Sequence, residues 1–150
     1  MYRLSYCIGL CLVFFLFLSS SAANLLGAPG DVDVNDKGVI EAAEFAVTEL
    51  NKMSNSLYLN KLTDIIKAQR QLVHGYNYFL TIEITPTTCR NNRQNLEKLE
   101  SCPIDTSKNA EPSICEVGVN VVEDRPGDKV MQFVRGPPVC TRVSKLNGNL

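Results

Sequence analysis

The sequence predicts an α+β fold in which one long helix packs on a twisted antiparallel β-sheet of four to five strands. Three observations lead to this prediction. Apolar residues recur at spacings of three and four in one early segment, they alternate with polar residues in several later segments, and glycine or proline stands between those later segments. The first pattern is typical of an amphipathic helix and the second of strands with one buried face. A helix that precedes a run of antiparallel strands indicates the α+β class.

The N-terminal residues 1–23 are expected to be a secretory signal peptide. Arg3 precedes an apolar run over residues 8–18, and small residues follow that run as far as Ala23. Such a run is too short to cross a bilayer, which needs roughly 20 apolar residues. We therefore expect a secreted protein without a membrane anchor, in which residues 24–150 form one domain.

The charged residues are nearly balanced in number, with 15 Lys and Arg against 16 Asp and Glu. No segment concentrates the basic residues, so neither nucleic acid nor an anionic membrane surface is expected as a partner. We expect the mature chain to be a monomer.

The mature chain is expected to contain disulfide bonds, because it is secreted and keeps an even number of cysteines. Two of the 6 cysteines fall within residues 1–23. The other four are Cys89, Cys102, Cys115 and Cys140. Three pairings of these four are possible, and the sequence does not choose between them, although pairing neighbours along the chain closes the shortest loops.

The first regular element is predicted to be a helix over residues 39–53, after an extended and mobile arm over residues 24–37. Asn35 or Asp36 is placed to cap its N-terminus. The apolar residues expected on its buried face are Ile40, Ala43, Val47 and Leu50.

The sheet is predicted to begin after a polar break over residues 51–60. A β-branched and apolar run over 62–73 and an alternating segment over 76–84 flank Gly75, as a hairpin turn requires. The buried face of the second strand is expected to consist of Tyr76, Tyr78, Leu80, Ile82 and Ile84.

Later strands are predicted over residues 117–121, 129–134 and 139–143. The turn Arg125-Pro126-Gly127-Asp128 joins the first two of them, and the polar stretch over 90–111 is expected to be a loop.

The turn between the first two strands resembles a known signature. It reads Gln71-Leu72-Val73-His74-Gly75, which is similar to the Q-x-V-x-G motif of the cystatin family. Leu25-Leu26-Gly27 is similar to the apolar pair and glycine that cystatins keep before the helix, and Ala46-Val47 with Leu50-Asn51-Lys52 resembles the family's helix. The four mature cysteines follow the order of the secreted two-disulfide, or type 2, cystatins, so the resemblance covers nearly all of residues 25–143.

This resemblance implies a tight-binding inhibitor of papain-like cysteine proteases, such as cathepsins, and not an enzyme. In cystatins, three segments form a wedge that enters the protease cleft: the N-terminal arm and two hairpin turns. Carried over to this sequence, the wedge consists of Leu25, Leu26 and Gly27 in the arm, Gln71, Leu72, Val73, His74 and Gly75 in the first hairpin, and Pro126 and Gly127 in the second.

One position of the wedge departs from the family pattern. Gly127 stands where cystatins commonly have tryptophan, and the chain contains no tryptophan. A buried aromatic anchor is often worth about 2 kcal/mol, so we expect weaker binding to some proteases. The missing anchor also favours an alternative function, a non-inhibitory binding module with the cystatin fold, whereas the intact motif over 71–75 argues against it.

A second protease site is implied after the helix. In one branch of secreted cystatins an asparagine at this place binds legumain, a protease that cleaves after asparagine, and Ser54-Asn55-Ser56 resembles that segment. The alternative is that Asn55 belongs to an ordinary polar segment that ends a helix.

Neither a metal site nor a catalytic site is expected. Residues 33–44 fit an EF-hand loop at several ligand positions, but Lys37 stands at one of them and cannot bind calcium, and no helix precedes the loop. His74 is the only histidine, and a Cys–His pair would need a free thiolate, whereas all four mature cysteines are expected to be oxidised. We therefore expect no metal ion and no cofactor.

Overall fold

The computed structural model describes residues 27–107, 109–134 and 136–143. Its elements, in chain order, are β1 (Gly30–Asp31), α2 (Lys37–Met53), β2 (Tyr58–Val73), β3 (Gly75–Arg90), α3 (Arg93–Leu96), the 3-10 helix η1 (Leu99–Ser101), β4 (Ser113–Arg125), β5 (Asp128–Phe133) and β6 (Val139–Arg142). The expected signal peptide over residues 1–23, together with Leu25 and Leu26, lies outside the described residues.

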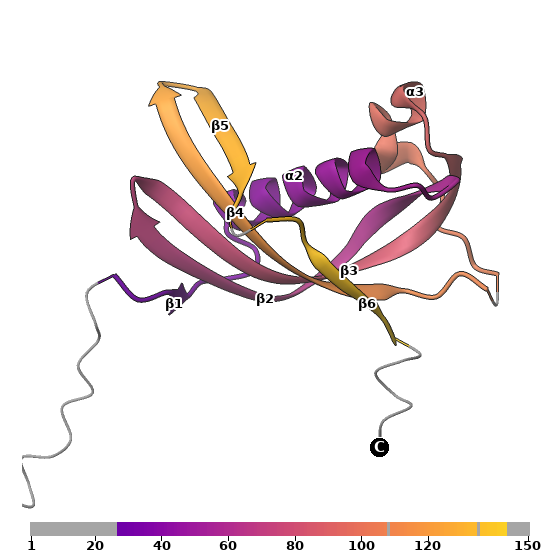
Figure 1. Ribbon diagram of the computed structural model, residues 1–150, viewed down its shortest axis with the longest axis horizontal. Coiled ribbons are helices and arrows are strands. Elements are labelled where there is room, and N and C mark those ends of the chain that lie inside the picture. The colour runs from indigo at the N-terminus through magenta and orange to yellow at the C-terminus, as the bar shows by residue number, and fades with distance from the viewer. Residues whose placement is uncertain (1–26, 108, 135, 144–150) are drawn as a thin grey trace, which may run out of the picture.

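The strands form one antiparallel sheet in the order β1-β2-β3-β4-β5, and β6 pairs with β4 as well. Strands β5 and β6 take successive stretches of the same edge of β4, since β5 pairs from Val119 onward and β6 pairs over Ser113–Glu116. Helix α2 lies along one face of the curved sheet (Figure 1). The α+β prediction is therefore confirmed, with six strands in place of four to five.

Helix α2 begins at Lys37, two residues before the predicted start at 39. Asp36, one of the two expected caps, accepts a hydrogen bond of 2.8 Å from the Gly38 amide. The buried face of α2 was only partly predicted. Ile40 is 37% exposed, whereas Ala43 and Val47 are buried and Leu50 is partly buried against the core. The fully buried set is Val39, Ala42, Ala43, Ala46, Val47 and Asn51. This stripe starts at Val39, and the next residue is turned about 100° away from it around the helix axis.

The long β2–β3 hairpin supplies much of the core beneath the helix. Tyr78, Leu80, Ile82 and Ile84 are buried as predicted, but Tyr76 is 40% exposed. Tyr76 follows directly after the turn, where the Arg70 guanidinium lies 5.0 Å from its ring centre. The first strand also starts earlier than predicted, at Tyr58.

Buried Asn51 explains why the polar break after the helix is short. Its side chain donates to the Asn60 carbonyl at 2.7 Å and accepts from the Asn60 amide at 2.8 Å. Its own backbone carbonyl accepts from Asn91 Nδ2 at 2.9 Å. These bonds join the end of α2 to the start of β2. They also satisfy the buried polar atoms of Asn51, which offsets the free-energy cost of removing this side chain from water.

The disulfides join Cys89 to Cys102 and Cys115 to Cys140, which settles the pairing that the sequence left open. The first closes a segment that is not the simple loop expected over residues 90–111, because α3 and η1 lie within it. Asn92 caps α3 by accepting from the Asn95 amide at 2.8 Å.

The segment before the helix is more ordered than the expected mobile arm. Gly30 and Asp31 form β1, which pairs with Arg70 and Gln69 of β2. Val32 and Val34 pack against the core. No helix within the described residues is long and apolar enough to cross a membrane.

Candidate protease-binding site

The first hairpin turns at His74, between β2 and β3. Gly75 has a φ of 78°, a conformation that residues with a side chain rarely adopt. A Cβ atom at this position would lie 2.2 Å from the Val121 carbonyl oxygen of β4. Glycine is thus needed at position 75 for the turn and also for the close approach of two strands.

The N-terminal arm is fastened beside this hairpin. Gln71 donates a side-chain hydrogen bond to the Gly27 carbonyl oxygen, and β1 pairs with β2 a few residues further along. Arg70 adds an ion pair of 3.9 Å with Asp36, the cap of α2. The described end of the arm is therefore held next to the turn, and Leu25 and Leu26 precede it outside the described residues.

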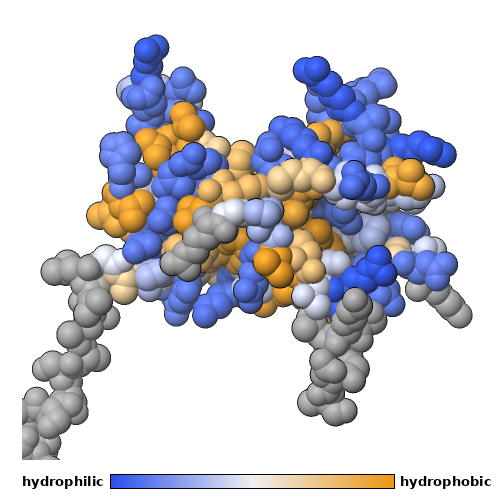
Figure 2. Space-filling view, in the orientation of Figure 1, coloured by the Kyte–Doolittle hydropathy of each residue, from blue (hydrophilic) through white to orange (hydrophobic). Residues whose placement is uncertain are grey.

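Apolar side chains are exposed around the first turn. Leu72 is 69% exposed and Val73 is 41% exposed. Figure 2 shows apolar surface at this end of the molecule, where the β2–β3 and β4–β5 turns lie. Exposed apolar groups beside a turn are the kind of surface that gains free energy when a partner covers it, at about 25 cal/mol per Å².

The second hairpin joins β4 to β5 through Pro126 and Gly127. Gly127 has a φ of 90°, and a proline followed by a glycine of positive φ is the pattern of a type II turn. The Gly127 amide donates to Glu123 Oε1 at 3.1 Å, and the pairing shifts by one residue between Glu123 and Arg125. Both turn residues are exposed, as is Val130, which is 55% exposed.

The fold brings the arm and both hairpins to one end of the molecule (Figure 1). Strand β4 makes this connection, because Val121 pairs with Tyr76 just after the first turn and then β4 continues into the second hairpin. Gly27, residues 71–75 and the Pro126-Gly127 turn are thus near one another, although up to 100 residues separate them in the sequence.

Asn55 is not part of this group. It is exposed in the connection between α2 and β2, where the Ser56 amide donates to Ser54 Oγ at 3.0 Å. Strand β2 has 16 residues and runs from this connection to the first turn, a contour length of about 50 Å. Asn55 therefore lies at the opposite end of β2 from the first hairpin.

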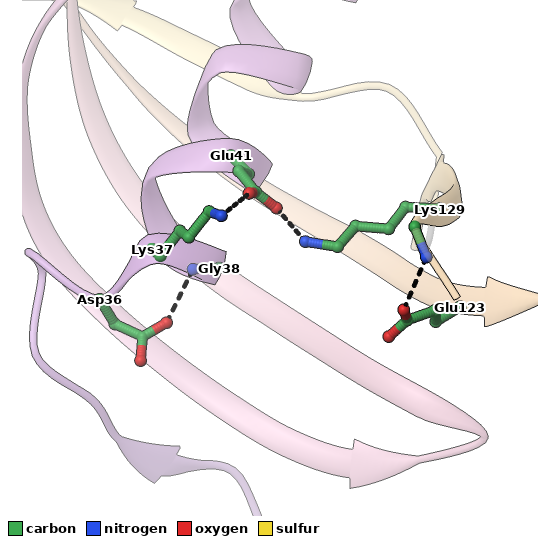
Figure 3. Close-up of polar contacts among 7 residues, drawn as sticks. Asp36, Lys37, Gly38, Glu41, Glu123 and Lys129 are labelled. Carbon is green, nitrogen blue, oxygen red and sulfur yellow. Dashed lines mark hydrogen bonds and ion pairs between the residues drawn. The ribbon is translucent and has the colours of Figure 1, made fainter. Parts of the chain in front are cut away.

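The structure also shows an interaction that the sequence analysis missed. Lys129 of β5 donates to Glu41 Oε2 of α2, and Lys37 lies 3.8 Å from Glu41 Oε1 (Figure 3). The hydrogen bond from Lys129 is the main cause of the lowered pKa of Glu41, and the same bond raises the pKa of Lys129. The spacing of four between Lys37 and Glu41 indicates a helical ion pair in the sequence itself. The contact with Lys129 could not be predicted from the sequence, because it joins residues 88 positions apart.

The described residues offer no catalytic constellation of the kinds considered above. All four of the cysteines among them are in disulfides, so none provides a thiolate for His74. Within residues 27–107, 109–134 and 136–143, no group of three His, Cys, Asp or Glu side chains could hold a metal ion. Asp33 accepts from the Asn35 amide at 2.9 Å, as part of the turn before α2.

Comparison with known proteins identifies relatives of this arrangement. A family model described as a cystatin domain matches residues 27–124. Cystatin-C of Bos taurus is 40% identical over 99 residues, which are 65% of this chain and 65% of that protein. Cystatin-C of Saimiri sciureus is 44% identical over 79 residues, 53% of this chain and 52% of that protein. The matches thus span about half to two thirds of the length of these curated relatives. The crystal structure of dimeric human cystatin F is similar with a TM-score of 0.68 and 30% identity, over 83% of this chain and 96% of that chain.

Proposed function

Because this chain belongs to the cystatin family, we propose that it is a reversible, tight-binding inhibitor of papain-like cysteine proteases of the cathepsin type. It blocks the protease cleft and catalyses no reaction itself. The observation that carries this proposal is the meeting of Gly27, residues 71–75 and the Pro126-Gly127 turn at one end of the fold, with apolar side chains exposed there.

In the proposed complex the first hairpin enters the deepest part of the cleft. Leu72 and Val73 are already exposed, so covering them gains free energy without unfolding any part of the inhibitor. His74 lies at the tip and contacts the cleft wall. Gly75 adopts its positive φ without the strain that a side chain would add, and the next residue, Tyr76, is already paired with Val121 of β4. The turn is therefore preformed, and a preformed turn loses little conformational entropy when it binds.

The arm and the second hairpin complete the contact on either side. Leu25 and Leu26 occupy apolar substrate pockets, and Gly27 lets the chain pass the catalytic thiolate without presenting a peptide bond for cleavage. Pro126 supplies apolar area in the second hairpin, but Gly127 provides no aromatic anchor. The affinity should therefore depend more on the arm and the first hairpin than in a cystatin with tryptophan at this position.

We also propose a second, independent site at Asn55 for legumain. Asn55 is exposed in a short connection whose backbone is held by Ser54 and Ser56, which suits recognition of an asparagine side chain by a protease that cleaves after this residue. Its distance from the first hairpin leaves room for two proteases at once.

The two disulfides fit an extracellular protein, and we propose a secreted monomer from which residues 1–23 have been removed. The alternative function, a non-inhibitory module with the same fold, is favoured by Gly127 in place of the anchor.

The proposal is tested by inhibition constants for a panel of papain-like proteases, with a trypsin-like serine protease as the specificity control. We expect reversible inhibition of the papain-like enzymes in a one-to-one ratio, and we expect mass spectrometry to recover the inhibitor uncut. Failure to inhibit any papain-like enzyme at micromolar concentration would instead support the non-inhibitory module.

The legumain site is tested with Asn55→Lys. This variant should lose legumain inhibition and keep the parent's constants for papain-like enzymes, because distant sites that share no contacts act independently. The reciprocal control is Gly75→Val, which should keep legumain inhibition. Size-exclusion chromatography should detect a ternary complex of the parent with both proteases. If the parent leaves legumain active, or if Asn55→Lys weakens papain binding as well, Asn55 is only a residue that follows the helix.

A further inference from the structure

The second hairpin projects beyond the end of the sheet. The last residue of β4 that pairs with β3 is Val121, and from there the β4–β5 ribbon continues without β3 beside it. Residues 123–130 are all exposed. A two-stranded ribbon has little stability of its own in water, so its direction depends on what holds it to the rest of the fold.

Two contacts with α2 hold this ribbon at different distances from its tip. Near the base, the Phe133 ring lies 5.7 Å from the Phe45 ring, and Met131 packs against the core. Further out, Lys129 donates to Glu41, two residues from the Pro126-Gly127 turn (Figure 3). The Glu41 side chain is 27% exposed, so solvent only partly screens this ion pair.

We propose that the Glu41–Lys129 ion pair sets the position of the second hairpin relative to the first, and that Glu41 is therefore a positioning residue for protease binding. This inference rests on the proposed inhibitory function. Glu41 belongs to α2, which is not one of the three segments of the wedge, so it acts on the Pro126-Gly127 turn through its contact with Lys129.

The charges around the pair keep it formed over a wide pH range. Lys37 on α2 also faces Glu41, while Glu123 of β4 and Tyr78 of β3 act on Lys129. Because the pKa of Glu41 is lower in the folded chain than its ordinary value of about 4.3, the pair is present above that value. It is lost as the pH falls through the lowered pKa. Lysine is charged at neutral pH in any case, and the raised pKa of Lys129 extends the pair to a pH above the ordinary lysine value, where it is lost as the pH rises through the raised pKa.

The first test compares Glu41→Gln with the matched control Glu44→Gln. Glu44 is an exposed carboxylate three residues further along α2, so the control removes the same charge from the same helix. We expect Glu41→Gln to dissociate about threefold faster from papain-like proteases, since an exposed or half-exposed ion pair contributes little more than that. Glu44→Gln should match the parent.

Lys129 variants separate positioning from direct contact with the protease. Lys129→Met should weaken binding as much as Glu41→Gln, the double variant should be no weaker than either, and Lys129→Arg should restore the parent's value. If Lys129→Met weakens binding and Glu41→Gln does not, Lys129 touches the protease itself and the proposal is wrong. Unchanged dissociation for both variants would also overturn it.

A measurement on the free protein keeps this inference distinct from the proposed function. Amide hydrogen exchange of residues 127–131 should be about threefold faster in Glu41→Gln than in the parent or in Glu44→Gln, and this difference should vanish at a pH low enough to protonate Glu41 in the parent. A parent that binds no papain-like protease would refute the inhibitory function, while the exchange rates would still test whether the Glu41–Lys129 ion pair holds the second hairpin in place. Equal exchange rates in Glu41→Gln and the parent would refute this role of the ion pair.

Discussion

The two hairpins at the candidate protease-binding end are held in different ways. The first is fixed by its backbone: Gly75 lies against Val121 of β4, and the arm and Arg70 fasten its side. The second extends beyond the last residue of β4 that pairs with β3. The ion pair between Lys129 and Glu41 is its contact with α2 nearest the tip. We therefore expect a substitution in the first turn to lower stability and binding more than one in the second. The closely packed backbone of the first turn has no room to adjust, whereas the projecting β4–β5 ribbon can shift.

The largest effect is expected where the backbone is packed most closely. Gly75→Val places a β-branched side chain at a φ of 78° and a Cβ atom against the Val121 carbonyl oxygen. We expect the free energy of unfolding to fall by about 3 kcal/mol. Inhibition of papain-like proteases should weaken at least about 100-fold, as measured by inhibition constants under conditions where circular dichroism shows a folded variant.

Gly30→Val is the matched control for this substitution. Gly30 also lies at the binding end, but a Cβ atom there meets nothing within 4 Å. Its unfolding free energy and inhibition constants should stay close to those of the parent. Equal inhibition by Gly75→Val and Gly30→Val would show that the first hairpin does not enter the cleft.

A smaller and uneven effect is expected from the arm. Deleting residues 24–27 removes two leucines and the carbonyl that Gln71 binds. Inhibition should weaken up to about 30-fold for proteases with deep apolar substrate pockets and less for those with shallow ones. The double variant Leu25→Ala and Leu26→Ala keeps the Gly27 carbonyl and shows how much of the loss belongs to the side chains. A loss of the same size for every protease would count against a role of the arm in specificity.

The smallest of these effects is expected at the second turn. Gly127→Trp restores an aromatic side chain, but the φ of 90° strains any residue other than glycine. Gly127→Ala carries the same strain without the ring and meets no atom within 4 Å. We expect Gly127→Trp to dissociate about tenfold more slowly than Gly127→Ala. Equal dissociation rates for the two variants would mean that this hairpin points away from the protease.

Features that depend on local sequence were well predicted. The helix, a cap at Asn35 or Asp36, the alternation over residues 76–84 and the glycine turns were predicted from periodicity and turn chemistry. The structure confirms the helix and the turns, identifies Asp36 as the cap, and buries the predicted face of the alternating strand except at Tyr76. The candidate site was named by its motif, but no pattern in the sequence showed that β4 would bring the two turns together.

The features that were missed depend on contacts between distant segments. Strand β1 consists of two residues with no alternation, and it exists because Arg70 and Gln69 offer a free edge. By sequence Asn51 is a polar residue in a predicted break, but it is buried, because the Asn60 backbone forms hydrogen bonds with its side chain. Ile40 has the right spacing for a core position, but only the direction in which the sheet packs decides which of two adjacent helical stripes is covered.

The disulfide between Cys115 and Cys140 makes hydrolysis of a peptide bond in the second turn differ in its consequence from hydrolysis in the first. The second turn lies between these two cysteines, which are 25 positions apart, so hydrolysis there leaves a single molecule in which the disulfide still links the two pieces. The first turn precedes all four cysteines of the described residues, so within that part of the chain hydrolysis at His74 would yield two fragments joined by hydrogen bonds and packing and not by a disulfide. The chain therefore stays in one covalent piece after a cut at its second hairpin, whereas its resistance to digestion at the first hairpin depends on the pairing of β2 with β3 around the turn and of β3 with β4 at Val121.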